Sequence, residues 1–456
     1  MSTTVYTDTI EIHVKQFNVQ ATAKATPSPP VNRPWNVAIV YAAFIVFGLG
    51  SWIMTNCVFV ETAALFQHVP ERAAISAYLI VALQAANLFP TLYMIFNSEQ
   101  QWFSIRSAIW VLLGLGVATC VLLALFWDRT TYFWGHEHST GLVFFGGAVS
   151  ATTTVVYYPF VSSFPPVFTS ALSTGEGLSG VVAGVLGIIQ DPGSNAMNIS
   201  VSGFFLCAAS VFAIAMVAFS FLVHSPIALE MQHSRYNEDP GDYDCKFTPP
   251  IQPSRTKSSE NMPLMNRPGP HHFASSRSRR DYVLRKLWKP LVCQVLLCAM
   301  SFGVIPSIMP FLGNKYQDSA QVLKWSSVLS MACDPLARFL TSFYRWYNVP
   351  VLATATMLLG ITMTLSATSA DPIFSTLPYG GIAPVAANCI FVFLFAYSQT
   401  MVYLTLKREV RFNESYAKTA YQWSGFLAQI GALLGTVIIF PLVSFTTLFQ
   451  DGFGET

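Results

Sequence analysis

Polar side chains recur inside long apolar runs of this sequence, and several share one helix face. Trp52 and Asn56 are four residues apart in the first run, and Gln84 and Asn87 are three apart in the second. Residues at these spacings are neighbours on a helix surface. A polar group inside an apolar spanning helix is costly and marks a functional candidate. We therefore expect Trp52, Asn56 and Asn87 to line a cavity.

Two later runs carry further candidates. Ser150, Thr154 and Tyr157 form an i, i+4, i+7 stripe, and Gln422 and Gln429 lie seven apart on one face. Hydroxyls often serve as close-packing contacts between helices, so Ser150 is interpreted as packing. A buried amide needs hydrogen-bond partners, which makes Gln429 the stronger candidate of the last run.

Four of the charged residues within or next to the apolar runs are functional candidates. Asp334 and Arg338 are four apart and can neutralise each other within one helix. Glu176, in GEGLSG, has no such local partner. It could face an aqueous path, carry a proton or pair with another helix. Glu61 closes the first run, where it is either a solvated helix end or a cavity residue.

These candidates are mainly neutral amides and hydroxyls interleaved with aromatic residues. Aromatic rings stack on flat solutes, and amides both donate and accept hydrogen bonds. Such a cavity suits an uncharged, planar, hydroxyl-bearing solute better than an ion. The sequence has no P-loop, HExxH, nucleophile elbow or zinc-type cysteine spacing. We predict that it is not an enzyme and holds no cofactor or metal.

The composition predicts a membrane protein. Hydrophobic residues make up 53% of the 456 positions and charged residues only 11%, whereas soluble domains carry about a quarter charged residues. The apolar surface must therefore face a lipid bilayer. The net charge is +2 and its charges fall between apolar runs, so we predict no nucleic-acid partner.

About eleven runs are long enough to span a membrane, which predicts an all-α polytopic fold. They are 36–60, 74–96, 106–127, 140–163, 166–190, 201–225, 288–312, 319–344, 350–369, 379–406 and 416–447. The polar segment 226–287 divides them into six and five, a plan common in secondary transporters. The predicted domains are a disordered tail 1–35, a half 36–225, a disordered linker 226–287, a half 288–447 and a tail 448–456.

Lysine and arginine are concentrated on the side of the membrane that holds the N-terminus and the linker. By the positive-inside rule this side is cytoplasmic. Eleven spans then place the tail 448–456 outside. The sequon at Asn198 falls in an outer loop and is a candidate glycosylation site, whereas the sequon at Asn413 falls inside.

Five segments resemble the riboflavin transporter family, solute carrier family 52. They are FGLGSWIMTNCVFVE at 47–61, PFVSSFPPVF to GEGLSG at 159–180, GVIPS at 303–307, DPLARFL at 334–340, and AQIGALLG with a following FP at 428–441. Together they run from the first apolar run to the last. The resemblance implies an arrangement similar to major-facilitator or equilibrative-nucleoside transporters.

The resemblance also implies uptake of riboflavin across the plasma membrane by alternating access, without a cofactor. Riboflavin, close flavin analogues and the lipid bilayer are then the expected partners. Trp52 with Tyr157 or Tyr158 would contact the flat ring. The residues expected to bind the ring edge or the ribityl chain are Asn56, Glu61, Asn87, Thr154 and Gln429.

The sequence departs from the family at two acidic positions. Glu176 stands where the family has Gln, and Asp334 where Asn is common, so both are candidate proton or coupling sites. Thr154 and Phe302 stand where some members have Asn. Two alternatives stay open: a nucleoside-like solute carrier, and a non-transporting receptor or sensor with the same fold.

Overall fold

The computed structural model divides the chain into two compact units, Met1–Ile39 and Val40–Thr456. The structure describes the following residues: 34–65, 83–100, 104–126, 131–133, 136–138, 141–190, 198–234, 276–316, 319–369, 372, 379–410, 414–446 and 448–449. Only the beginning of one helix belongs to the first unit. Everything described below concerns the second unit.

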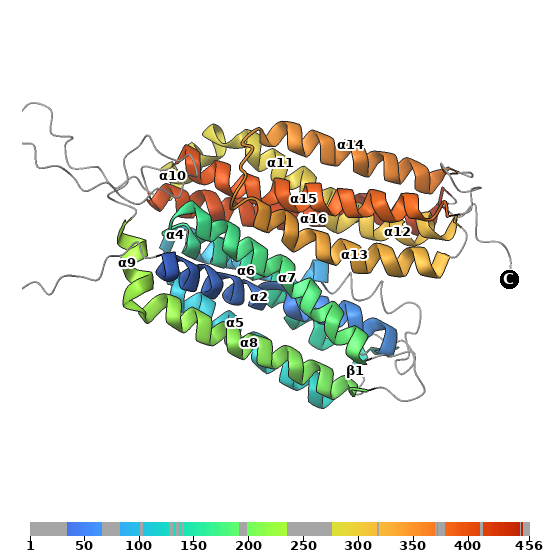
Figure 1. Ribbon diagram of the computed structural model, residues 1–456, viewed down its shortest axis with the longest axis horizontal. Helices are drawn as coiled ribbons and strands as arrows, with labels where there is room; N and C mark the ends of the chain where they lie inside the picture. The colour runs from blue at the N-terminus through green and yellow to red at the C-terminus, as the bar shows by residue number, and fades with distance from the viewer. Residues whose placement is uncertain are drawn as a thin grey trace, which may run out of the picture. The chain divides into compact units, whose positions relative to one another are not determined.

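Helices make up nearly all of the described residues (Figure 1). Those before the linker are α2 (Pro34–Leu65), α4 (Leu88–Gln100), α5 (Ile105–Phe126), α6 (Gly141–Val161), α7 (Pro166–Gln190), α8 (Val201–His224) and α9 (Pro226–Ser234). After it come α10 (Ser276–Lys286), α11 (Trp288–Cys298), the π-helical turn η4 (Ala299–Val304), α12 (Ile305–Asn314), α13 (Ser319–Leu340), α14 (Val349–Thr368), α15 (Ile382–Glu409) and α16 (Glu414–Phe445). Strands β1 (Thr131–Phe133) and β2 (His136–His138) form a small antiparallel pair that the sequence did not predict.

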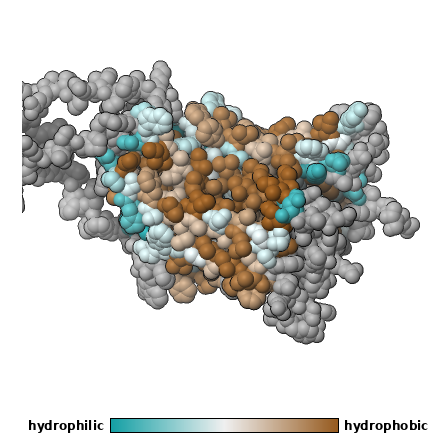
Figure 2. All heavy atoms as spheres, turned by 60° about the horizontal axis from the view of Figure 1, so that its bottom comes forward, coloured by the Kyte–Doolittle hydropathy of each residue, from teal (hydrophilic) through white to brown (hydrophobic). Residues whose placement is uncertain are grey.

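Eight described helical segments are long and apolar enough to cross a membrane. They are Pro34–Val58, Ile105–Phe126, Pro166–Gln190, Val201–His224, Trp288–Asn314, Val349–Thr368, Ile382–Glu409 and Glu414–Val443. On the face in Figure 2, apolar residues cover the middle and hydrophilic residues gather toward the two ends. These features confirm a multi-pass helical membrane protein. The count of eleven spans stays a prediction, because part of the second predicted run lies outside the described residues.

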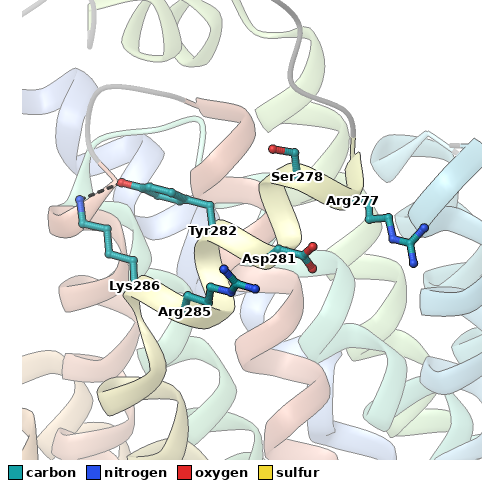
Figure 3. Close-up of a pocket in the computed structure, with 6 residues that line it drawn as sticks. All are labelled: Arg277, Ser278, Asp281, Tyr282, Arg285 and Lys286. Carbon is teal, nitrogen blue, oxygen red and sulfur yellow. Dashed lines mark hydrogen bonds between the residues drawn. The ribbon is translucent and has the colours of Figure 1, made fainter.

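The composition of the linker 226–287 predicted disorder, but both of its ends form helices. Its first residues form α9 and its last residues form α10, shown close up in Figure 3. Val283 and Leu287 are fully or almost fully buried and four residues apart, and α10 packs against α16. Ala228 and Met231 are likewise buried on α9, which packs against α8. One small apolar face was enough to order each helix on the bundle.

Close backbone contacts hold the helices that carry the candidate residues. A Cβ at Gly48 of α2 would meet the carbonyl oxygen of Leu172, and one at Gly175 of α7 would meet that of Ile45. A Cβ at Gly425 of α16 would meet the carbonyl oxygen of Thr154 on α6. Small residues allow this approach in helical bundles. They fix α2 against α7, and α6 against α16.

Helices from before and after the linker are in direct contact. α13 packs against α7 and α15, and α16 packs against α6, α11 and η4. In Figure 1, α7 in green lies beside α13 in orange, in agreement with these contacts. Side chains on α7, α13 and α16 can therefore meet across the two predicted halves. This arrangement creates the candidate site.

Candidate functional site

A cavity of about 520 Å³ lies between helices from both predicted halves. Side chains of α2, α6 and the segment 83–87 line it from the first half, and those of η4, α12, α13, α15 and α16 from the second. Its volume falls within the range of small-molecule sites. Four of the predicted residues line it, namely Trp52, Asn56, Asn87 and Gln429.

One aromatic pair forms part of the cavity wall. Trp52 on α2 and Phe302 on η4 are stacked with ring centroids 5.6 Å apart and planes 2° from parallel. Phe395 of α15 meets Phe302 edge to face at 5.4 Å. The π-helical turn carries both Ser301 and Phe302 into the cavity lining. π-Helical turns are frequent at functional sites.

Two amides and a hydroxyl form a hydrogen-bonded chain along the cavity wall, which joins the first half to the second. Asn87 Nδ2 donates to Gln84 Oε1 over 2.9 Å, and Gln84 Nε2 donates to the Thr436 hydroxyl on α16 over 3.2 Å. All three residues line the cavity. The sequence predicted that Gln84 and Asn87 share one helix face, and the hydrogen bond between them agrees with this prediction.

A hydrogen bond to α7 orients the side chain of Asn56. Its Nδ2 donates to Ser179 Oγ over 2.9 Å, and the Ser179 hydroxyl donates to the carbonyl oxygen of Glu176 over 2.6 Å. No hydrogen bond from another described residue reaches the Asn56 side-chain oxygen. The carboxamide is therefore oriented by one end and leaves an acceptor for a solute in the cavity.

Gln429 is oriented in the same way, by α6. Its Nε2 donates to the Thr154 hydroxyl over 3.2 Å, and Thr154 itself donates to the carbonyl oxygen of Ala151. Thr154 does not line the cavity. The structure places this predicted binding residue behind Gln429, where it can position the amide and not touch the solute directly.

Tyr157 and Tyr158 do not line the cavity either. Tyr157 is buried against Phe47, with ring centroids 4.2 Å apart, and Tyr158 stacks on Tyr403 at 3.7 Å. Both tyrosines are buried outside the cavity lining, which gives the expected ring contact no support. The side chain of the remaining predicted residue, Glu61, lies outside the described residues.

The structure adds a polar wall that the sequence reading missed. Ser326, Ser327 and Ser330 of α13 line the cavity, as does Asn388 of α15, whose Nδ2 donates to Ser326 Oγ over 2.9 Å. The sequence analysis did not consider these three serines, and Ser150, which it interpreted as packing, lines the cavity as well. Asn388 is one of two amides in the apolar run 379–406, and the rule that selected Asn56 would have found it.

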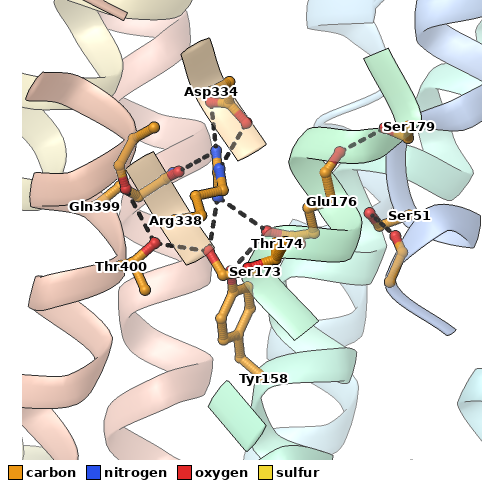
Figure 4. A network of polar contacts seen from close by, with 12 residues as sticks. Ser51, Tyr158, Ser173, Thr174, Glu176, Ser179, Asp334, Arg338, Gln399 and Thr400 are labelled. Carbon is orange, nitrogen blue, oxygen red and sulfur yellow. Dashed lines mark hydrogen bonds and ion pairs between the residues drawn. The ribbon is translucent and has the colours of Figure 1, made fainter. Parts of the chain in front are cut away.

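Beside the cavity, one buried arginine gathers polar groups from three helices (Figure 4). Arg338 Nε and Nη2 donate to the two carboxylate oxygens of Asp334 over 2.7 and 3.2 Å, the predicted i, i+4 pair. Its Nη1 donates to Ser173 Oγ over 2.9 Å and to Glu176 Oε2 over 3.4 Å. Its Nη2 also donates to Gln399 Oε1 over 2.9 Å.

Glu176 thus pairs with a residue on another helix, one of the three roles left open. The Tyr158 hydroxyl also donates to Glu176 Oε2, over 2.6 Å. The other oxygen, Oε1, is buried and has no hydrogen-bond partner among the described residues. The cavity residues Ser330 and Met331 lie about one turn before Asp334 on α13. The network therefore borders the cavity, between α7 and α13.

Asn198, the candidate glycosylation residue, is exposed. Its Nδ2 donates to the carbonyl oxygen of Ile189 over 3.0 Å. Modification of this nitrogen would require the contact to open. Within the described part of the chain, no group of three or more His, Cys, Asp or Glu residues is arranged to hold a metal ion.

A model of the family "Solute carrier family 52, riboflavin transporter" matches residues 36–451. The chain belongs to this family. Among curated relatives, solute carrier family 52 riboflavin transporter member 3-A of Danio rerio is 28% identical over 91% of this chain and 97% of its own length. Riboflavin transporter rft-1 of Caenorhabditis elegans is 29% identical over 89% of this chain and 96% of its own length.

Solved structures confirm the expected fold type for this family member. The proton:xylose symporter XylE of the major facilitator superfamily matches with a TM-score of 0.55 and 12% identity, over 92% of this chain and 91% of the other. The chain therefore has a transporter fold of the major facilitator type. Family and fold together identify a membrane transporter and not an enzyme.

Proposed function

We propose that the chain carries riboflavin into the cell across the plasma membrane, through the cavity between α2, α13 and α16. The observation that carries this proposal is the composition of the cavity wall. It combines the parallel rings of Trp52 and Phe302 with neutral amides and serine hydroxyls from both halves. The names of the family and of the relatives support riboflavin as the substrate.

Riboflavin has a flat isoalloxazine ring and a ribityl chain of hydroxyls, and each part has a matching wall. The Trp52 and Phe302 pair offers an aromatic surface for the ring. The amides of Asn56, Asn87 and Gln429 would bind the polar edge of the ring. The serines of α13 would bind the ribityl hydroxyls. An analogue without the polar edge of the ring would leave these buried amides unpaired, which is the physical basis of its rejection.

Transport in this proposal follows from movement of the halves 36–225 and 288–447 around the cavity. The contacts of Arg338 with Ser173 and Glu176 join α13 to α7 and must open when these helices separate. Glu176 and Asp334 are the proposed proton or coupling sites. A proton on Glu176 would neutralise the carboxylate that is exposed when the pair with Arg338 opens.

The finer topology remains part of the proposal. The N-terminal tail and the linker face the cytoplasm, the segment 448–456 lies outside, and Asn198 lies on the outer side where it can be glycosylated. No cofactor takes part, and close flavin analogues share the site. The positive-inside rule supports this orientation.

Uptake of labelled riboflavin by cells that express the chain tests the proposal. We expect saturable uptake that excess riboflavin or lumiflavin blocks and excess uridine does not. Cells that express the Asn56→Ala variant at equal surface density serve as the matched control. Inhibition by uridine would favour a nucleoside-like carrier. Saturable binding without flux would favour a receptor or sensor.

A further inference from the structure

The helix α10 carries an unusual density of positive charge just before a membrane span. Residues 276–289 contain six Lys and Arg residues and one acidic residue, Asp281. Such a cluster next to a spanning helix attracts anionic lipids at the membrane surface. A charge run by itself is ordinarily a solvated face, so the proposal depends on how α10 is held and what surrounds it.

Buried contacts fix the direction in which the charges of α10 point. Val283 and Leu287 are buried, and α10 packs against α16. Tyr282 meets Tyr416 of α16 edge to face, with ring centroids 5.0 Å apart. The exposed residues of α10 form two columns at i, i+4 spacing. These are Arg277, Asp281 and Arg285, and Ser278, Tyr282 and Lys286.

The two columns line an open surface hollow, drawn in Figure 3. Lys286 Nζ donates to the Tyr282 hydroxyl over 2.8 Å. This hydrogen bond and the electrostatic effect of Tyr282, and to a smaller extent the nearby Glu409, raise the pKa of Lys286. Asp281 is paired with Arg280 at 3.1 Å. Among the described residues, Arg277 and Arg285 have no carboxylate within salt-bridge distance.

The hollow lies at the level where lipid headgroups are expected. One residue, Leu287, separates α10 from α11, which begins at Trp288. Trp288, Val292 and Leu296 are exposed at successive i, i+4 positions, as a lipid-facing column would be. Trp side chains are enriched at the membrane–water interface. The basic side chains therefore begin where the apolar column ends.

We propose that α10 binds the phosphate-bearing headgroup of an anionic phospholipid. Arginine side chains bind phosphate oxygens through paired N–H donors, and the Ser278 hydroxyl adds a neutral donor. The proposed orientation of the chain puts α10 on the cytoplasmic side, the leaflet that carries anionic lipids. A lipid fits better than a free phosphate because the apolar column of α11 starts one residue beyond the hollow.

Native mass spectrometry of the purified full chain tests this binding directly. The chain is equilibrated with mixed micelles of phosphatidylcholine and phosphatidylinositol 4,5-bisphosphate, and bound lipid is counted. We expect the wild-type chain to retain the anionic lipid selectively. The variant Arg277→Gln/Arg285→Gln should bind it about tenfold or more weakly, because each basic residue contributes to the attraction. Lys286→Gln should lose a smaller part.

The matched control Arg106→Gln/Lys324→Gln removes two exposed charges elsewhere and should bind as the wild-type chain does. The charge-conserving Arg277→Lys/Arg285→Lys should keep most of the binding. Equal binding by the Gln variant, equal loss in the control, or displacement of the lipid by excess inorganic phosphate would overturn the proposal. Riboflavin takes no part in the measurement, so its outcome is independent of the transported substrate.

Discussion

The rings of Trp52 and Phe302 stack in the cavity wall, with an angle of 2° between their planes and 5.6 Å between their centroids. They belong to helices on opposite sides of the linker, α2 and η4. A flat solute that covers one of these rings therefore touches a pair whose members belong to different halves. Movement of one half changes the aromatic surface offered to the solute.

Replacement of Trp52 tests the aromatic wall. We expect Trp52→Ala to raise KM for riboflavin about tenfold, since a stacked aromatic pair contributes about 0.5–1.5 kcal/mol beyond buried area. Trp52→Phe keeps a ring and should stay within about threefold of the wild-type KM. Initial rates of labelled riboflavin uptake at equal surface expression give both values. Equal KM in Trp52→Ala and the wild-type protein would remove the ring from the site.

Replacement of Asn56 tests the amide wall. Asn56→Ala should reduce uptake about tenfold or more, because a lost polar contact leaves its partner on the solute unpaired, at about 1–3 kcal/mol. Ser179→Ala is the matched control, since it removes only the partner that orients Asn56. We expect this control to retain more uptake than Asn56→Ala. The reverse order would mean that Asn56 acts through α7 and not on the solute.

The Glu176→Gln variant tests the proposed coupling site. The titratable and charged groups that face Glu176 are Tyr157, Tyr158, Arg338, Asp334 and Tyr403. A Gln oxygen can still accept from Tyr158 and Arg338, so transport should persist. The ratio of uptake rates at two pH values should move toward one, because the carboxylate no longer titrates. A well-expressed but inactive Glu176→Gln protein would count against this role.

Arg338 is expected to matter for folding as well as transport. Arg338→Met leaves the buried Glu176 carboxylate and the part-buried Asp334 carboxylate without a counter-charge, and breaking a buried pair costs about 3–5 kcal/mol. The detergent-solubilised variant should melt well below the wild-type protein. Addition of Glu176→Gln and Asp334→Asn removes both charges and should restore much of the melting temperature. No recovery in this triple variant would show that packing, not charge, sets the loss.

The length of the apolar runs predicted much of the fold, because the runs are long and bounded by polar loops. The helix α8, Val201–His224, corresponds to the predicted run 201–225 almost residue for residue. The same method failed at α10, where charged residues hide the two apolar side chains that hold the helix. Burial of Val283 and Leu287 depends on α16, which lies more than a hundred residues further along the chain.

Within the site, residue spacing showed which side chains share a helix face. It did not show which neighbouring helix that face contacts. Asn56 and Gln429 were found because amides are rare in apolar runs, and both line the cavity. Tyr157 and Tyr158 were assigned to the ring by type, yet they pack against Phe47 and Tyr403 outside the cavity lining. That distinction depends on which helices pack together, which a local pattern does not contain.

The guanidinium of Arg338 has five N–H directions, and five acceptor atoms surround it. Three of these acceptors belong to Asp334 and Gln399, on α13 and α15, while two belong to Ser173 and Glu176 on α7. If α7 moves away, the cation keeps its majority of partners and remains electrically balanced by Asp334. The carboxylate of Glu176 on the departing α7 then lacks its counter-charge, and this side chain must either take up a proton or be hydrated.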